Sequence, residues 1–114
     1  MLNYLKKKVY ELQNLGISEL IIDPGFGFGK TLQHNFSLLK HLSVFKILDC
    51  PILVGMSRKR MIQQTINGEA AQALNGTTAA HMLALQNGAQ ILRVHDVKEA
   101  KEAIDIYKQY RDSV

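Results

Sequence analysis

Short apolar segments that are typical of buried strands alternate with helical patterns along this chain, and this alternation restricts the fold more than any other feature. The segments are residues 19–24, 51–55 and 89–94. Alternation of this kind is typical of a parallel sheet with helices packed outside it. Because a sheet of three strands leaves two uncovered edges, the pattern predicts an α/β fold that is part of a larger structure.

Apolar residues at spacings of three and four predict the helices between these segments. In residues 2–15 the apolar positions are separated by lysines, and Gly16 follows them as a C-cap residue would. Residues 67–73 show no clear period and are predicted to form a loop. Further helices are predicted over residues 34–48, 61–66, 78–86 (opened by Gly76 and Thr77) and 98–110.

Composition and charge exclude several classes of protein. Of the 114 residues, 46% are hydrophobic and 21% are charged, which excludes collagen-like and disordered chains. The single cysteine, Cys50, excludes an internal disulfide framework and a four-cysteine zinc site. The net charge of +4 favours anionic partners. However, the tight basic run Lys6–Lys8 lies in an amphipathic helical pattern, so we interpret it as a solvated helix face and not as a nucleic-acid site.

The sequence also indicates where the chain acts. No apolar run approaches the roughly 18 residues that a membrane helix needs. Residues 1–8 reach their lysines before any apolar core, which is not the pattern of a secretory signal. We therefore expect a cytoplasmic protein that binds neither membranes nor nucleic acids.

Polar and charged residues follow each of the predicted strands. They are, in chain order, Asp23, Ser57, Arg58, Lys59, Arg93, His95 and Asp96. Because function gathers at the carboxyl ends of parallel strands, we expect an acid, several cations and an imidazole at one rim of the sheet. Each residue also has a structural explanation, as a turn residue, a helix opening or a cap for the last helix. Their combination at one rim favours a ligand site.

A glycine-rich loop over residues 24–31 follows the first predicted strand, but it fits neither common nucleotide motif. Pro24 stands where a Walker A motif needs glycine, and Lys30 stands where the dinucleotide fingerprint needs its last glycine. Glycines at alternate positions let the backbone approach a flat ligand closely. Phe28 could lie against such a ligand, and we expect one of Phe26 and Phe28 to pack in the core.

The sequence offers no convincing metal site. The histidines do not fall at ligand spacing with carboxylates. His34 and His41 are seven residues apart in a predicted helix, and we interpret them as surface residues. Cys50 precedes a predicted strand with no base nearby in sequence, so we predict that it is a small buried apolar residue.

Three motifs resemble those of the dihydropteroate synthases, in the same order and at similar spacing. They are Asp23 to Lys30 (DPGFGFGK), Val54 to Lys59 (VGMSRK) and Arg93 to Val97 (RVHDV). Asn35 and the pair Gly76-Thr77 also stand where that family has them. The family folds as a (β/α)8 TIM barrel, so the resemblance implies that residues 1–114 are the C-terminal part of a pterin-binding barrel. That part comprises strands six to eight with their helices.

The resemblance implies a reaction and assigns roles to the rim residues. The family condenses 6-hydroxymethyl-7,8-dihydropterin pyrophosphate with para-aminobenzoate, which gives dihydropteroate and pyrophosphate for folate biosynthesis. By resemblance, Asp23, Lys59 and Arg93 would bind the pterin, while Arg93 and His95 would bind pyrophosphate. Lys59, Arg93 and His95 would be the catalytic residues. A carboxylate suits the 2-amino-pyrimidinone edge because it accepts from two adjacent N–H groups.

The second substrate is assigned to the glycine loop and the segment after the second strand. By resemblance, Gly27, Phe28, Ser57, Lys59 and Arg60 would bind para-aminobenzoate. Arg60 stands where many members have serine, and an arginine there could still pair with the carboxylate of the substrate. Residues 71–74 lack the Glu-Arg pair that often precedes this region in the family.

The resemblance also implies partners and a cofactor. Mg²⁺ is expected, with its ligand on the N-terminal part of the family's barrel and none on this chain. We expect the chain to form a homodimer or to associate with the other part of the barrel, and we predict no turnover by the chain alone. The family is a sulfonamide target. Two alternatives remain, a non-catalytic pterin-binding half barrel that self-associates, and a related methyltetrahydrofolate-binding methyltransferase domain. The motifs at residues 57–59 and 93–96 favour the synthase over the latter.

Overall fold

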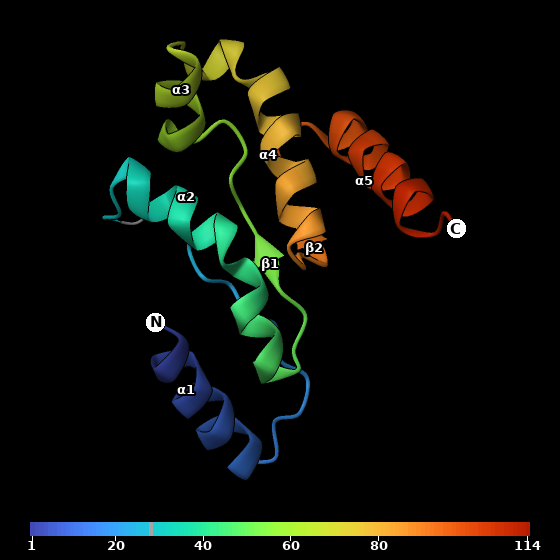
Figure 1. The fold of residues 1–114 in the computed structure, drawn as a ribbon. Helices are drawn as coiled ribbons and strands as arrows, with labels where there is room; N and C mark the ends of the chain where they lie inside the picture. Colours follow the sequence, from blue (N-terminus) through green and yellow to red (C-terminus); the bar gives the residue numbers. More distant parts are fainter. Residues whose placement is uncertain (28) are drawn as a thin grey trace.

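A computed structural model describes residues 1–27 and 29–114. It shows an α/β arrangement in which helices surround a small parallel sheet (Figure 1). The elements, in chain order, are α1 (Leu2–Asn14), α2 (Leu32–Lys40), the 3₁₀ helix η1 (Leu42–Leu48), β1 (Leu53–Val54), α3 (Arg60–Ile66), the 3₁₀ helix η2 (Ala70–Gln72), α4 (Leu74–Gln86), β2 (Ile91–Leu92) and α5 (Val97–Arg111).

The sheet confirms the predicted second and third strands in shortened form. β1 and β2 run parallel, with Leu53 opposite Ile91 and Val54 opposite Leu92. The helix α2 packs against α3 and α4, and α5 packs against the outer side of α4 (Figure 1). Parallel pairing across a helical connection is what the alternation in the sequence predicts.

The prediction of a buried strand over residues 19–24 is wrong. The segment forms no continuous strand pairing and is not fully buried. Only Ile22 pairs, through a parallel bridge to Ile52. Its N–H donates to the carbonyl oxygen of Pro51 at 2.8 Å, and its own carbonyl oxygen accepts from the N–H of Leu53 at 2.7 Å. The neighbouring Ile21 is 56% exposed. This segment has a partner on one side only within the described residues, so its pairing stays at a single bridge.

The helix predicted over residues 34–48 is two helices of different type. α2 begins at Leu32 because the hydroxyl of Thr31 accepts a hydrogen bond from the N–H of His34. After α2 the chain continues as the 3₁₀ helix η1. Its buried residues Leu42, Phe45 and Leu48 are three apart, which matches the three residues per turn of a 3₁₀ helix.

The region between α3 and α4 is more ordered than the sequence predicts. The predicted loop contains η2, which begins with a capping box between Glu69 and Gln72. α4 begins at Leu74, four residues before the predicted start, so Gly76 lies inside its first turn. A Cβ at Gly76 would lie 2.8 Å from Cγ2 of Ile62. Glycine at this position therefore lets α3 pack closely against α4.

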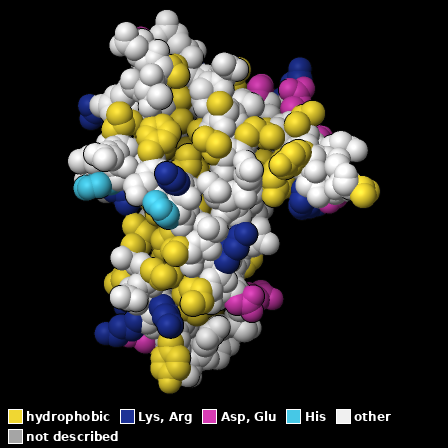
Figure 2. Space-filling model, in the orientation of Figure 1, with side chains coloured by type: hydrophobic (Ala, Val, Ile, Leu, Met, Phe, Trp, Pro, Cys, Tyr) yellow, Lys and Arg dark blue, Asp and Glu magenta, His cyan; other side chains and the backbone are white. Residues whose placement is uncertain are grey.

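One hydrophobic cluster joins the helices to the sheet. Phe26, Leu42, Val54, Met56 and Ala84 are among its fully buried members. Apolar side chains also remain exposed, and they form patches on the face of the molecule in Figure 2. In the described part of the chain, no helix has the length and apolar character needed to cross a membrane.

The prediction that Cys50 is buried is wrong. The side chain is only partly buried, and its thiol donates to the carbonyl oxygen of Leu48 at 3.3 Å. Cys50 follows the left-handed residue Asp49 at the end of η1, where the chain turns at the surface before entering the sheet.

Candidate functional site

An ion pair joins the ends of the first and third strand segments. Nη1 of Arg93 lies 3.2 Å from Oδ2 of Asp23. The other carboxylate oxygen of Asp23 accepts from the N–H of Gly25 at 3.0 Å, which opens the glycine loop. Both ionic side chains are partly exposed at the rim. The parallel register thus brings together two residues that are 70 positions apart in the chain.

Gly55, at the end of β1, makes room for this pair. A Cβ at this position would lie 2.9 Å from Cζ of Arg93, which is closer than real Cβ atoms approach a neighbour. Any larger residue would push the guanidinium away from Asp23. The lack of a side chain at Gly55 therefore leaves the space that the Arg93 guanidinium occupies.

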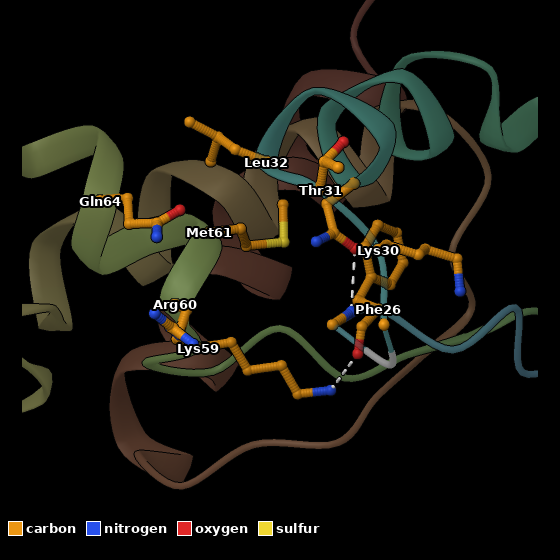
Figure 3. A pocket seen from close by; sticks show the side chains of 11 residues that line it. Phe26, Lys30, Thr31, Leu32, Lys59, Arg60, Met61 and Gln64 are labelled. Atoms are coloured by element: carbon orange, nitrogen blue, oxygen red, sulfur yellow. Dashed lines mark hydrogen bonds between the residues drawn. The ribbon is translucent and has the colours of Figure 1, made fainter.

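The glycine loop is held by side chains from three places in the chain. Nζ of Lys59 donates to the carbonyl oxygen of Phe26 at 2.8 Å, and Oδ1 of Asn35 accepts from the N–H of Gly27 at 2.9 Å (Figure 3). Nζ of Lys30 donates to the carbonyl oxygen of Gly25 at 2.6 Å. These bonds fix a loop whose glycines take positive φ angles.

Phe26 is the core residue that the sequence led us to expect in this loop. It is 1% exposed and belongs to the main hydrophobic cluster. The proposed contact of Phe28 with a flat ligand falls on the one position that lies outside the described residues. Gly27 is exposed at the loop surface, with Cδ of Lys59 3.6 Å from where its Cβ would be.

The ammonium group of Lys59 is in an environment that disfavours its charge. Burial lowers the pKa of Lys59, and the nearby charges of Arg93 and Lys30 lower it further, while Asp23 opposes them. A cation at this rim is therefore stabilised when an anionic or electron-rich ligand arrives.

A pocket of about 590 Å³ lies beside Lys59, a size within the usual range for small-molecule sites. Thr31 and Leu32 line it from the side of α2, and Met61 and Gln64 line it from α3 (Figure 3). Its charged lining consists of Lys30, Lys59 and Arg60, and the described lining residues include no carboxylate. The pocket therefore suits a small ligand that carries a negative charge.

Ser57 and His95 connect two strand ends. Ser57 is 5% exposed, and its hydroxyl oxygen accepts from the backbone N–H of His95 at 3.2 Å. In this structure the hydroxyl of Ser57 thus joins the strand ends and does not line the pocket. His95 is exposed at the same rim as Arg93.

The structural alternative that His95 or Asp96 caps the last helix does not account for the side chain of Asp96. Asp96 is the N-cap residue of α5 but makes no side-chain cap hydrogen bond. Its carboxylate instead accepts from Nε and Nη2 of Arg58 at 2.9 and 3.0 Å. The guanidinium of Arg58 lowers the pKa of Asp96.

The hydrogen-bond partners of Arg58, Asn35 and Thr77 were not predicted from the sequence. Asn35 and Thr77 are 4% and 2% exposed, respectively. A buried polar residue in an apolar helix pattern needs a hydrogen-bond partner. The polar residues within the two apolar helix patterns were therefore the sequence feature that could have indicated these bonds. The partner of Asn35 is the glycine loop, and the hydroxyl of Thr77 accepts from the N–H of Arg58 at 3.0 Å.

Metal binding finds no support in the described part of the chain. No group of three or more His, Cys, Asp and Glu residues there could hold an ion. His34 and His41 are both exposed, and Nδ1 of His41 lies 3.0 Å from the carbonyl oxygen of Ser37.

Comparisons with known proteins agree with each other. Residues 1–95 match the sequence model of the family described as pterin binding enzyme. The dihydropteroate synthase of Escherichia coli K12 is 46% identical over 105 residues, which is 90% of this chain and 37% of that protein. The dihydropteroate synthase of Xanthomonas albilineans, solved in complex with 7,8-dihydropteroate, is 39% identical with a TM-score of 0.94.

The similarity to the X. albilineans enzyme covers 99% of this chain and 44% of that chain. The Yersinia pestis enzyme, solved with a pterine-sulfa conjugate, is 43% identical with a TM-score of 0.92, over 98% of this chain and 45% of that one. The chain therefore spans less than half the length of each of these relatives.

Proposed function

The chain belongs to the family of pterin-binding enzymes, and from this membership we propose that it forms the C-terminal part of a dihydropteroate synthase. The similarity to whole dihydropteroate synthases along nearly all of the chain supports this proposal. The observation that carries it is the rim itself, where Asp23, Arg93 and Lys59 lie around the glycine loop beside a cationic pocket.

The fold fits strands six to eight of a (β/α)8 barrel. The segment at Ile22, β1 and β2 are parallel and adjacent, and helical segments follow each of them. The edge at Ile22 would pair with a further strand in a closed barrel. The proposed domain is thus residues 1–114 as one part of a pterin-binding barrel, completed by the rest of the barrel or accompanied by a second copy of the chain.

The proposed reaction joins two substrates at one carbon atom. The bond between the exocyclic methylene carbon of the dihydropterin and its pyrophosphate oxygen breaks, and pyrophosphate leaves with the electron pair. The amine nitrogen of para-aminobenzoate forms a bond to the same carbon and gives up one proton. The chain must therefore bind a flat pterin, an anionic leaving group and an aromatic acid close together.

Asp23 and Lys59 suit the pterin. The Asp23 carboxylate can accept from the two adjacent N–H groups of the 2-amino-pyrimidinone edge. The Lys59 ammonium, a cation at the rim, would donate to ring acceptors. The glycine loop between them brings backbone within reach of the ring because its glycines carry no side chains.

Arg93 and His95 suit the pyrophosphate. Both follow β2 at the rim, and the guanidinium of Arg93 is held by Asp23 in the structure. Negative charge grows on pyrophosphate as its bond to carbon breaks, so cations that reach it there stabilise the transition state more than the ground state. The Arg93 guanidinium would move from Asp23 to the phosphate oxygens or contact both.

The pocket beside Lys59 suits para-aminobenzoate. Arg60 and Lys59 line it and can pair with the carboxylate, while Gly27 would lie along the ring. A sulfonamide has a similar aromatic amine, and we propose that it competes for this pocket. Ser57 does not line this pocket. It would support para-aminobenzoate binding indirectly, by joining the two strand ends through its hydrogen bond to His95.

Mg²⁺ does not fit the described residues of this chain, because they offer no suitable ligand group. We propose that the ligands of Mg²⁺ lie on the other part of the barrel. We also propose a cytoplasmic location.

Calorimetry with 6-hydroxymethylpterin and pyrophosphate tests the proposed binding role. The chain should bind the pterin, and Lys59→Ala should weaken binding at least about tenfold, as loss of one charge-assisted hydrogen bond does. Lys101→Ala is the matched control, because Lys101 is an exposed lysine on α5. Unchanged affinity in Lys59→Ala, or no binding by the parent chain, would refute the assignment.

Turnover tests whether the rest of the barrel is needed. We expect the chain alone, given both substrates and Mg²⁺, to form no dihydropteroate. Formation of product by the 114-residue chain would contradict the proposal that it is one part of a larger catalytic unit.

A further inference from the structure

The residue before Lys59 has an unusual backbone conformation. Arg58 has a φ of 55°, and among the described residues the other non-glycine residues with positive φ are Asp49 and Asn67. Asp and Asn visit this left-handed region routinely, because their short side chains bond locally, but arginine does not. Something outside the turn must therefore hold Arg58 in place.

The side chain and backbone of Arg58 are bonded to several separate segments. The guanidinium donates two bonds to the Asp96 carboxylate, and Nη1 donates to the carbonyl oxygen of Ala70 at 2.6 Å. The backbone N–H donates to Oγ1 of Thr77, and the carbonyl oxygen accepts from Nε2 of Gln63 at 2.7 Å. The turn is thus tied to α3, η2, α4 and the start of α5.

Asp96 also gives up a local preference for this contact. Aspartate is a favoured N-cap residue, because its carboxylate can accept from the first N–H groups of a helix. At the N-cap of α5 it makes no such bond and pairs with Arg58 instead. Arg58 takes an unfavourable backbone conformation and Asp96 gives up its cap bond, and both changes accompany this one contact. We infer that the contact holds another residue in place.

The position that the contact serves is that of Lys59. The backbone N–H of Lys59 donates to the carbonyl oxygen of Met56 at 3.1 Å and closes the turn around Arg58. From there the Lys59 side chain crosses beside Gly27 to the carbonyl oxygen of Phe26. A different φ at the preceding residue would aim this side chain elsewhere.

We propose that Arg58 and Asp96 are a positioning pair that fixes the turn before α3 and so holds the Lys59 ammonium over the glycine loop. The link to pterin binding rests on the proposed function, while the link to the position of Lys59 does not. Neither residue is proposed to touch substrate. Their effect reaches the site through Lys59 alone.

Asp96→Asn tests the pair, because it keeps the shape of the side chain and removes its charge. Asp105→Asn is the matched control, since Asp105 forms an exposed ion pair with Lys101 on the same helix. The readout is the pKa of Lys59, followed by ¹³C NMR of labelled lysine in the unliganded chain, with circular dichroism to check folding. Burial and Arg93 lower this pKa in the parent chain.

We expect Asp96→Asn to raise the pKa of Lys59 toward the ordinary lysine value, and Asp105→Asn to leave it where it is. An unchanged pKa of Lys59 in folded Asp96→Asn would overturn the proposal. If Asp96→Asn does not fold, Arg58→Lys keeps a cation beside Asp96 but cannot make the paired bonds, and the same upward shift is expected. Its absence would overturn the proposal equally.

Pterin calorimetry on the same variants separates the two hypotheses. If the parent chain binds no pterin but Asp96→Asn still shifts the pKa of Lys59, the positioning pair stands and the proposed function fails. If the parent chain binds pterin, we expect about a tenfold loss of affinity in Asp96→Asn. Loss of affinity without a change at Lys59 would overturn the positioning role and leave the proposed function standing.

Discussion

We expect a buried histidine on α4 to make the stability of this chain depend on pH. His81 is 2% exposed, and its Nε2 atom has no hydrogen-bond partner within the described residues. Burial lowers the pKa of His81, and the charge of Asp96 opposes this in part. Protonation inside the fold would place an unpaired charge in an apolar environment, which is costly.

The sign and size of the effect follow from proton linkage. In the unfolded chain His81 takes up a proton near pH 6.5, while in the folded chain it does so only at lower pH. The free energy of unfolding is therefore full above about pH 6.5 and falls as the pH drops below it, until the folded pKa is reached. Between about pH 7.5 and pH 5.5 one such group removes up to about 1.4 kcal/mol.

Urea denaturation followed by circular dichroism at these two pH values measures the effect. We expect both His81→Leu and His81→Gln to lose less stability on acidification than the parent chain does. The two replacements differ in polarity, so a shared change identifies the proton and not the packing of the new side chain. The same loss of stability in the parent chain and in both variants would refute the reasoning.

Three further substitutions test local geometry. Gly55→Ala should displace the Arg93 guanidinium and weaken pyrophosphate binding about tenfold in calorimetry, with unchanged helix content; equal affinity would contradict it. Gly76→Ala should lower the free energy of unfolding by about 1 kcal/mol, because its Cβ overlaps Ile62. Adding Ile62→Val should recover this loss in urea denaturation, and no recovery would count against that overlap. Asn35→Ala should cost about 1 kcal/mol in the same assay, since it removes the bond to the glycine loop; a stability equal to the parent's would argue against this bond.

The sequence predicted the rim well because parallel topology leaves little choice. Once residues 51–55 and 89–94 are strands joined by a helix, their carboxyl ends must lie at one edge. Asp23 and Arg93 accordingly meet in the structure. The sequence predicted that one of Phe26 and Phe28 packs in the core, and the buried side chain of Phe26 confirms this.

Boundaries were harder to predict because they depend on contacts distant in sequence. Periodicity could not separate α2 from η1, since a spacing of three residues occurs in both kinds of helix. The first strand looked as apolar as the others, but its outer neighbour is absent from the described residues, so only Ile22 pairs. Gly76 was predicted as a helix opening, but it lies inside the first turn of α4, where it faces Ile62 of α3.

The partner of Asp96 could not be predicted from local sequence. An aspartate before a helix is typical of an N-cap, and its pairing with Arg58, 38 residues away, depends on how α5 packs against the rest of the fold. The same holds for the hydroxyl of Ser57, which bonds a strand end 38 residues away. Such contacts are set by tertiary packing, which overrides local preference.

The most direct test of the central claim is to locate the pterin on the chain. Amide chemical shifts of the ¹⁵N-labelled chain, recorded with increasing 6-hydroxymethylpterin, report which backbone groups the ligand approaches. We expect the largest changes at Gly25, Gly27 and Gly55, around the rim that carries Asp23 and Arg93. Changes centred instead on the cavity at the opposite end of the strands, between Cys50 and Gly88, would contradict it.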